Sequence, residues 1–136
     1  NQIIRFFHCD PAGIVYYPNY FDMIQSLMED WFTQSLRIDY ADFISNRRLG
    51  LPTVKIECEF MAPSKIGETI TLVPHVTKIG RSSLALRIDA LAGEQLRLRA
   101  HIVVVTTSLE NNRSIPIPPD LRERLVDYQQ QTQEEG

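Results

Sequence analysis

The sequence predicts an α+β fold in which a curved antiparallel sheet packs against one long central helix. Three observations support this. Apolar residues recur at three- and four-residue steps over residues 18–36, as in an amphipathic helix. Four later segments alternate apolar and polar residues, as in strands with one buried face. Short turn sequences join these segments, and parallel strands would need crossovers of about a dozen residues or more.

The elements follow one another in a simple order. A strand-like run over residues 3–7 comes first. The long helix extends from Pro18 to Leu36, and a proline suits its first turn because the missing amide hydrogen has no intrahelical partner there. A weaker helical segment over residues 40–48 stops before Gly50. After three prolines, a short helix is predicted over residues 120–128.

The four strand segments are predicted to form an antiparallel meander with one apolar face. They span residues 54–60, 70–77, 84–90 and 96–104. Pro74 cannot donate a ladder hydrogen bond, so it predicts an edge position or a bulge in its strand.

The other face of the sheet carries charge and some apolar surface. Arg97 and Arg99 alternate on one strand and are predicted to pair with Glu57 or Glu59 across the sheet. Residues 103–105 are all valines, and this strand is therefore apolar on both faces. The pattern predicts that the second face is covered too, and a subunit contact is one way to cover it.

Length and composition narrow the function classes. The chain has 136 residues and a net charge of −3, which predicts one domain over residues 1–128 and a polar tail over residues 129–136. The acidic balance argues against nucleic-acid binding, and no apolar run is long enough to span a membrane. Cys9 and Cys58 make neither a disulfide framework nor a metal-binding pair, which favours a reducing, cytoplasmic setting.

The segment before the long helix carries the candidate chemistry. Asp10-Pro11 and Gly13 form a bend, and the chain then enters a helix N-terminus at residues 17–19. A helix N-terminus presents unpaired amide hydrogens and partial positive charge, which suit a developing oxyanion. A carboxylate a few residues upstream can face the polarised carbonyl, as acyl transfer requires. From spacing alone, an aspartate before a proline is more often a turn former.

Other reactive residues give weaker patterns. His8 and Cys9 are neighbours in a strand-like run, and such side chains point to opposite faces. His75 and His101 are single residues on strands without metal-ligand spacing. The sequence has no phosphate-binding loop, dinucleotide fingerprint or nucleophile elbow. We therefore expect neither a metal nor a cofactor.

The run D-P-A-G-I-V-Y-Y-P-N-Y-F over residues 10–21, followed by a long helix and antiparallel strands, resembles the 4-hydroxybenzoyl-CoA thioesterase family of hotdog-fold proteins. The resemblance extends from Ile3 to about Leu125. It implies a hotdog fold, with the sheet wrapped around the helix, and hydrolysis of an acyl-CoA thioester to a carboxylic acid and free coenzyme A. It also implies homodimers or homotetramers, with sheets paired edge to edge and the active site at the subunit interface.

The resemblance implies roles for three residues of the motif. Asp10 is the carboxylate implicated in thioester cleavage, as nucleophile or general base. The backbone amide of Tyr17 polarises the thioester carbonyl, and Gly13 lets the chain pass close to the substrate. Many short-chain acyl-CoA thioesterases of the superfamily carry a histidine where this chain has Pro18, so the motif is of the hydroxybenzoyl type.

The resemblance also implies that basic residues near a turn between the middle strands hold the coenzyme A phosphates. The candidates here are Lys78, Arg81, Ser82 and Ser83. This turn is poorer in basic residues than that of the hydroxybenzoyl enzyme, and an ordinary solvated turn explains it equally well.

Two other functions stay open at this point. A hotdog hydratase or dehydratase acting on acyl thioesters typically needs a histidine paired with a carboxylate, and His8 is the only nearby candidate. A non-catalytic protein that binds acyl thioesters would keep the fold, but a carboxylate at position 10 does little for binding an anionic ligand.

Overall fold

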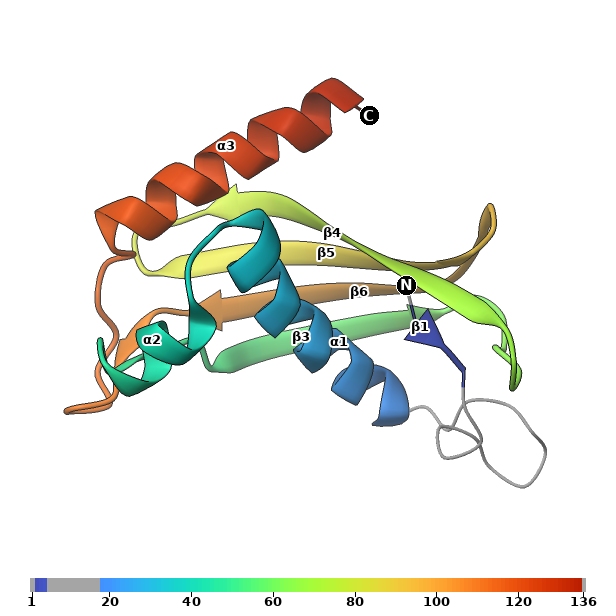
Figure 1. The fold of residues 1–136 in the computed structure, drawn as a ribbon, viewed down its shortest axis with the longest axis horizontal. Coiled ribbons are helices and arrows are strands. Elements are labelled where there is room, and N and C mark those ends of the chain that lie inside the picture. Colours follow the sequence, from blue (N-terminus) through green and yellow to red (C-terminus); the bar gives the residue numbers. More distant parts are fainter. Residues whose placement is uncertain (1, 5–17, 136) are drawn as a thin grey trace.

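The structure is a computed structural model that describes residues 2–4 and 18–135. Figure 1 shows the elements, which are, in chain order, β1 (Gln2–Ile3), α1 (Pro18–Asp30), η2 (Trp31–Ser35), α2 (Tyr40–Ser45), β2 (Leu49–Gly50), β3 (Thr53–Phe60), β4 (Thr69–Ile79), β5 (Ser83–Ala92), β6 (Gln95–Val105), β7 (Thr107–Ser108) and α3 (Pro119–Glu135).

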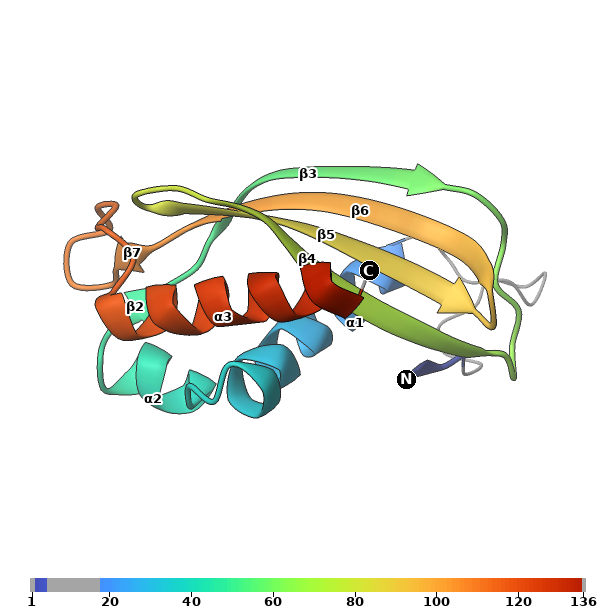
Figure 2. The same ribbon diagram turned by 90° about the horizontal axis from the view of Figure 1, so that it is seen from above.

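One curved antiparallel sheet and a layer of helices make up the fold. The strands of the sheet lie in the order β1-β4-β5-β6-β3, and β2 and β7 form a separate small pair. All three α-helices lie on the same side of the sheet, with α1 crossing its middle (Figure 2). α3 lies along β4, where the Tyr128 hydroxyl donates a hydrogen bond of 2.9 Å to the Pro74 carbonyl. The predicted α+β layout is confirmed.

The core forms where the two sequence periods meet. Along β5 and β6, every second side chain points toward the helices and is buried; these are Leu84, Leu86, Ile88, Ala90, Leu98, Ala100, Ile102 and Val104. Helix α1 and η2 contribute the opposing stripe, namely Tyr20, Met23, Ile24, Met28, Trp31 and Phe32. The strand period of two and the helix period near 3.6 thus each place one apolar face against the other.

The predicted meander is wrong in one respect. β3 pairs with β6 rather than with β4, which follows it in the chain; Phe60 lies opposite Leu98 and Cys58 opposite Ala100. Residues 61–68 therefore cross the end of the sheet from one edge to the other. Alternation shows that a segment is a strand but not which strand it pairs with, and the crossing is fixed by polar contacts far apart in sequence.

The helix ends differ from the prediction at two places. The helix starting at Tyr40 ends at Ser45 rather than Arg48, whose positive φ of 54° stops helical geometry. Asp39 caps its start by accepting hydrogen bonds from two backbone amides. α3 continues to Glu135 through the residues predicted as a polar tail, because glutamine and glutamate are good helix formers. The division into a domain and a tail stays a prediction.

The sequence also predicts that Pro74 lies at an edge or a bulge and that no apolar run is long enough to span a membrane. Among the described residues, β1 pairs with β4 at Thr69 and Ile70 and does not extend to Pro74, which lies opposite Ile88 of β5. The side of Pro74 toward β1 is thus at an edge in this part of the chain, as the missing amide hydrogen predicts. Within the described ranges, no helix combines the length and the apolar character needed to cross a membrane.

The packing at the centre of the sheet gives a stability prediction. Ile88 is fully buried on β5, between Pro74 and Ala100 of the neighbouring strands. We expect Ile88→Ala to lower the free energy of unfolding by about 2–5 kcal/mol, because it removes buried methyl groups and leaves a cavity, and Ile88→Val by about 0.5–1.5 kcal/mol. Urea denaturation checks both. Equal losses for the two variants would contradict this account of the core.

Candidate functional site

The predicted catalytic residues lie outside the described part of the chain. Asp10, Gly13 and Tyr17 fall within residues 5–17, as do His8 and Cys9, and their roles stay predictions. The structure does define both flanks of this segment. Ile4 precedes it and is buried beside β4, and α1 begins directly after it.

Both flanks are fixed to the same loop, the crossover of residues 61–68. The Ile4 amide donates to the Glu68 carbonyl at 2.8 Å, and the Gly67 amide donates to the Ile4 carbonyl at 2.8 Å. On the other flank, the hydroxyl of Tyr20 in the first turn of α1 donates to the Ser64 hydroxyl at 2.8 Å. Ser64 is almost fully buried. The segment with the candidate chemistry is therefore anchored at each end by one loop.

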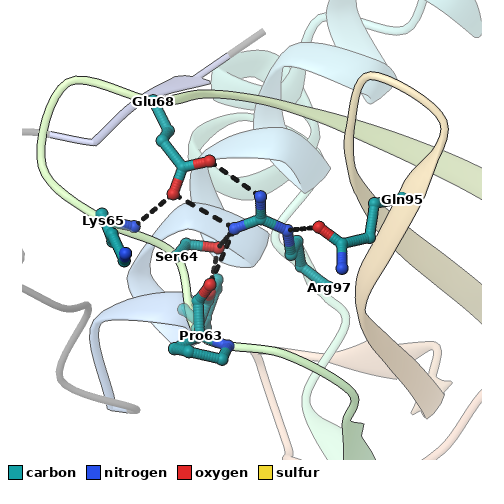
Figure 3. A network of polar contacts seen from close by, with 7 residues as sticks. Pro63, Ser64, Lys65, Glu68, Gln95 and Arg97 are labelled. Carbon is teal, nitrogen blue, oxygen red and sulfur yellow. Dashed lines mark hydrogen bonds and ion pairs between the residues drawn. The ribbon is translucent and has the colours of Figure 1, made fainter.

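Arg97 of β6 holds this loop (Figure 3). Its Nη2 donates to Glu68 Oε2 at 2.7 Å, its Nη1 to the Pro63 carbonyl at 2.7 Å, and its Nε to Gln95 Oε1 at 2.8 Å. Only 11% of the Arg97 side chain is exposed. The prediction that Arg97 pairs with Glu57 or Glu59 is wrong. The partner of Arg97 is Glu68, the residue before β4, which the crossover loop brings to the end of β6.

The charges of this pair reinforce each other. Hydrogen bonds from Arg97, and then from the Lys65 amide, hold the pKa of Glu68 below its usual value. The same contact raises the pKa of Arg97 further above neutrality. A buried guanidinium needs such partners because desolvation of an unpaired charge is costly.

A cavity of about 260 Å³ lies between α1 and the β3 edge of the sheet. Its walls are mostly apolar and are formed by Ile24, Gln25, Met28, Phe32, Tyr40, Leu51, Thr53, Ile56, Ile102 and Val104. Ile56 is 42% exposed on the edge strand, so this side of the cavity reaches the surface. An apolar cavity with a few polar groups is the usual form of a small-molecule site.

Gln25 and Tyr40 supply polar groups to this cavity. Burial raises the pKa of the Tyr40 hydroxyl, a hydrogen bond with Gln25 opposes the shift, and the charge of Glu29 adds to it. The hydroxyl therefore stays protonated near neutral pH and is available as a donor.

Several apolar side chains of the edge strand β3 are exposed over much of their surface. Val54 is 61% exposed at the bulge between Thr53 and Lys55, and Phe60 is 52% exposed although it lies on the face that α1 covers elsewhere. In this chain β3 has β6 on one side and no described strand on the other. Besides this bulge, the strand carries three charged residues between its apolar ones, namely Lys55, Glu57 and Glu59. The exposed apolar side chains form a surface that a second strand would cover.

The predicted coenzyme A residues lie at the other end of the sheet. Lys78 lies next to the last residue of β4 and Arg81 in the turn before β5, and both side chains are exposed. Ser82 and Ser83 are partly buried. This turn is next to the start of α3, whereas α1 begins at the opposite end of the strands (Figure 1). Within the described residues, this turn and the start of α1 therefore lie at opposite ends of the sheet.

The face of the sheet away from the helices carries an ion cluster. Arg99 donates from Nε to Asp89 Oδ1 at 2.9 Å. Glu59 lies opposite Arg99 in the register of β3 and β6, as predicted, and its charge adds to the larger effect of Asp89 in raising the pKa of Arg99. Arg87 and His75 lie 3.5 and 3.7 Å from the Asp89 carboxylate. Burial and the charge of Arg87 lower the pKa of His75. Among the described residues, no group of three or more potential metal ligands comes together.

Comparisons with known proteins agree on one family. A family model described as the thioesterase-like superfamily matches residues 4–125. The 1,4-dihydroxy-2-naphthoyl-CoA hydrolase of Acaryochloris marina is 27% identical over 123 residues, covering 88% of this chain and 89% of its own length. The 4-hydroxybenzoyl-CoA thioesterase of a Pseudomonas species is 27% identical over 127 residues, covering 88% of this chain and 90% of its own length.

Solved structures share the same arrangement of helix and sheet. The crystal structure of a 1,4-dihydroxy-2-naphthoyl-CoA thioesterase from Synechocystis superimposes with a TM-score of 0.83 at 23% identity, covering 93% of each chain. At this identity the likeness shows a shared fold.

The Glu68–Arg97 pair makes stability depend on pH. The folded-state pKa of Glu68 is lowered, so its contribution is fully present above the pKa of an unfolded glutamate, about 4.3, and is lost as pH falls through the folded-state value. We expect Glu68→Gln to lower the urea midpoint at pH 7, and the difference from the parent to shrink below about pH 4. Urea denaturation from pH 3 to pH 7 measures this. Glu94→Gln, on the exposed turn after β5, controls for the loss of one carboxylate. A difference that stays constant with pH would contradict the ion pair.

Proposed function

The chain belongs to the thioesterase-like superfamily and has the hotdog fold, and from this premise we propose that it is an enzyme that hydrolyses acyl-CoA thioesters. The observation that carries the proposal is the family match over residues 4–125, which includes the motif of residues 10–21. The relatives named above act on coenzyme A thioesters of hydroxylated aromatic acids. We propose the same general class of substrate for this chain.

The proposed chemistry pairs Asp10 with the start of α1. The amide of Tyr17 donates to the thioester carbonyl oxygen and stabilises the negative charge that develops on it. Gly13 allows the backbone to approach the substrate closely. A carboxylate and an amide donor are sufficient for acyl transfer to water without a metal or cofactor.

Two routes to products are compatible with these groups. In the first, the Asp10 carboxylate attacks the carbonyl carbon, coenzyme A leaves as a thiolate, and water cleaves the resulting anhydride. In the second, Asp10 removes a proton from water, the oxygen of that water attacks the carbonyl, and the C–S bond breaks. Both consume one water and yield a carboxylate, the coenzyme A thiol and a proton. Water oxygen found in the Asp10 carboxylate after a single turnover would identify the first route.

The cavity beside α1 fits the acyl group. Its apolar walls favour burial of a ring or a short chain, and the Gln25–Tyr40 pair offers hydrogen bonds to a polar substituent. A cavity of about 260 Å³ is at the small end of ligand sites, which favours a compact acyl group over a long fatty chain.

We propose that two chains pair through β3 and complete the site together. A symmetric contact between identical edges makes the two β3 strands antiparallel. Thr53 of one chain then lies toward Phe60 of the other. Thr53 lines the cavity, and Phe60 lies beside Tyr20 at the start of α1, with ring centroids 6.2 Å apart. Pairing therefore brings the cavity of one subunit toward the helix N-terminus of its partner.

The same pairing accounts for the position of the turn at residues 80–82. In one chain Lys78 and Arg81 lie at the end of the sheet away from the start of α1. In an antiparallel pair, that end of one subunit lies beside the start of α1 of the other. We propose that these cations, with Ser82 and Ser83, bind the phosphates of a coenzyme A whose acyl group is cleaved at the partner's helix. Association of dimers into a homotetramer stays a prediction.

Release of free thiol from a panel of aromatic, short, medium and long acyl-CoA thioesters tests the proposed activity. We expect the highest turnover with compact hydroxylated aromatic acyl groups. Asp10→Asn should keep the far-UV spectrum and coenzyme A binding of the parent but lower kcat by at least about 100-fold, because general base and nucleophilic roles contribute factors of this size.

Two outcomes would contradict this assignment. Parent-level hydrolysis by Asp10→Asn would exclude the carboxylate from the reaction. Loss of enoyl absorbance from an enoyl thioester without thiol release would indicate a hydratase instead.

The proposed edge pairing predicts the effect of a charge on β3. Val54→Lys places an ammonium on the apolar edge, and we expect it to shift the protein from dimer to monomer in sedimentation velocity and to reduce turnover. Glu123→Lys on the exposed side of α3 is the control and should leave the oligomeric state unchanged. A parent protein that sediments as a monomer at micromolar concentration would contradict the pairing.

A further inference from the structure

We propose that Arg97 is a positioning residue for the thioesterase reaction, acting through the crossover loop and Tyr20 on the start of α1. The inference rests on the proposed function and concerns Arg97, outside the motif, and Tyr20, a motif residue to which neither the motif nor the comparisons assign a role. It follows from one geometric fact: the segment with the candidate catalytic groups is anchored on both sides by a single loop.

The anchors differ in kind. On the β1 side, Ile4 exchanges two backbone hydrogen bonds of 2.8 Å with Glu68 and Gly67. On the α1 side, one side-chain contact of 2.8 Å joins Tyr20 to Ser64. The loop therefore sets the distance between the place where the segment leaves the sheet and the place where it enters the helix.

Arg97 determines the shape of that loop. It binds both ends of residues 63–68, contacting the Pro63 carbonyl at one end and the Glu68 carboxylate at the other. Its Nη1 also lies 3.4 Å from Ser64 Oγ, the atom that accepts the hydrogen bond from the Tyr20 hydroxyl. Glu68 in turn accepts from the Lys65 amide at 2.7 Å. Removing the guanidinium leaves the loop without its common partner.

Small shifts of the crossover loop and of the start of α1 are expected to affect catalysis more than substrate binding. An amide donor stabilises an oxyanion only at hydrogen-bond distance from the position that the oxygen occupies in the transition state. Displacement of about 1 Å can lower a rate by about 100-fold. The acyl cavity and the turn at residues 80–82 have their own supports, so substrate affinity should change little.

Arg97→Met and Tyr20→Phe test the proposal in an active parent enzyme. We expect kcat to fall by at least about tenfold in Arg97→Met and about threefold to tenfold in Tyr20→Phe, with KM and coenzyme A binding within about twofold of the parent. Arg97→Lys, which keeps the charge but not the forked geometry, should recover part of the loss. Tyr20→Phe changes one hydroxyl, so it remains informative if Arg97→Met does not fold.

Matched controls separate positioning from stability. Arg47 makes a similar two-bond contact with Asp120, at 2.8 and 3.1 Å, and Tyr128 donates one hydrogen bond from α3. Arg47→Met and Tyr128→Phe should lower Tm as the test variants do but keep the parent kcat. All rates are measured well below the Tm of each variant.

A double variant adds a second criterion. Tyr20→Phe and Ser64→Ala remove the same hydrogen bond, so their effects on kcat should not add. Parent-level kcat in Arg97→Met or Tyr20→Phe, or equal losses in the matched controls, would overturn the positioning role while leaving the thioesterase assignment intact. Absence of thiol release by the parent would instead contradict the proposed function.

Discussion

The packing of α1 against the concave face of the sheet is the interaction on which the rest of the fold depends. An isolated helix of this length is marginal in water, and a sheet with one apolar face cannot stay exposed. Trp31 and Phe32 are almost fully buried between the two layers, as are the facing residues of β5 and β6. Burial of each large side chain contributes about 1.5–3 kcal/mol. Sheet and helix are therefore stable only together, and the helix position is set by the curvature of the sheet.

The crossover of residues 61–68 converts that packing into a precise site. Because β3 pairs with β6, the chain must pass the end of the sheet before it can begin β4. The passage places Ser64 under the first turn of α1 and Glu68 beside Ile4. A largely buried arginine at its centre is a costly choice for stability alone, because most of its guanidinium must be desolvated. Its directional donors fix a geometry that apolar contacts would leave adjustable.

The exposed edge of β3 links the fold to the proposed reaction. The same strand supplies uncovered apolar side chains and a wall of the cavity, and in one chain the start of α1 and the basic turn lie at opposite ends of the sheet. A second copy paired across this edge would cover the exposed side chains, close the cavity wall and bring the turn of one chain to the start of α1 of the other. A small domain built on one sheet and one long helix has too little interior volume to enclose a large cleft. A site formed between two copies does not require such a cleft.

The sequence by itself determined the α+β class, the long helix, the four long strands and the motif of residues 10–21, because each depends on local periodicity or a contiguous run of residues. The tertiary structure alone decided the order of the strands, the end of α3 and the hydrogen-bond partners of Arg97 and Arg99. Alternation is the same whichever strand lies alongside, and Arg97 and Glu68 are 29 residues apart. The cavity beside α1 was not predicted either, since its walls come from α1, η2, α2, β3 and β6 and from Leu51. Pairing and cavity formation depend on which surfaces meet in space, and local sequence patterns do not specify that.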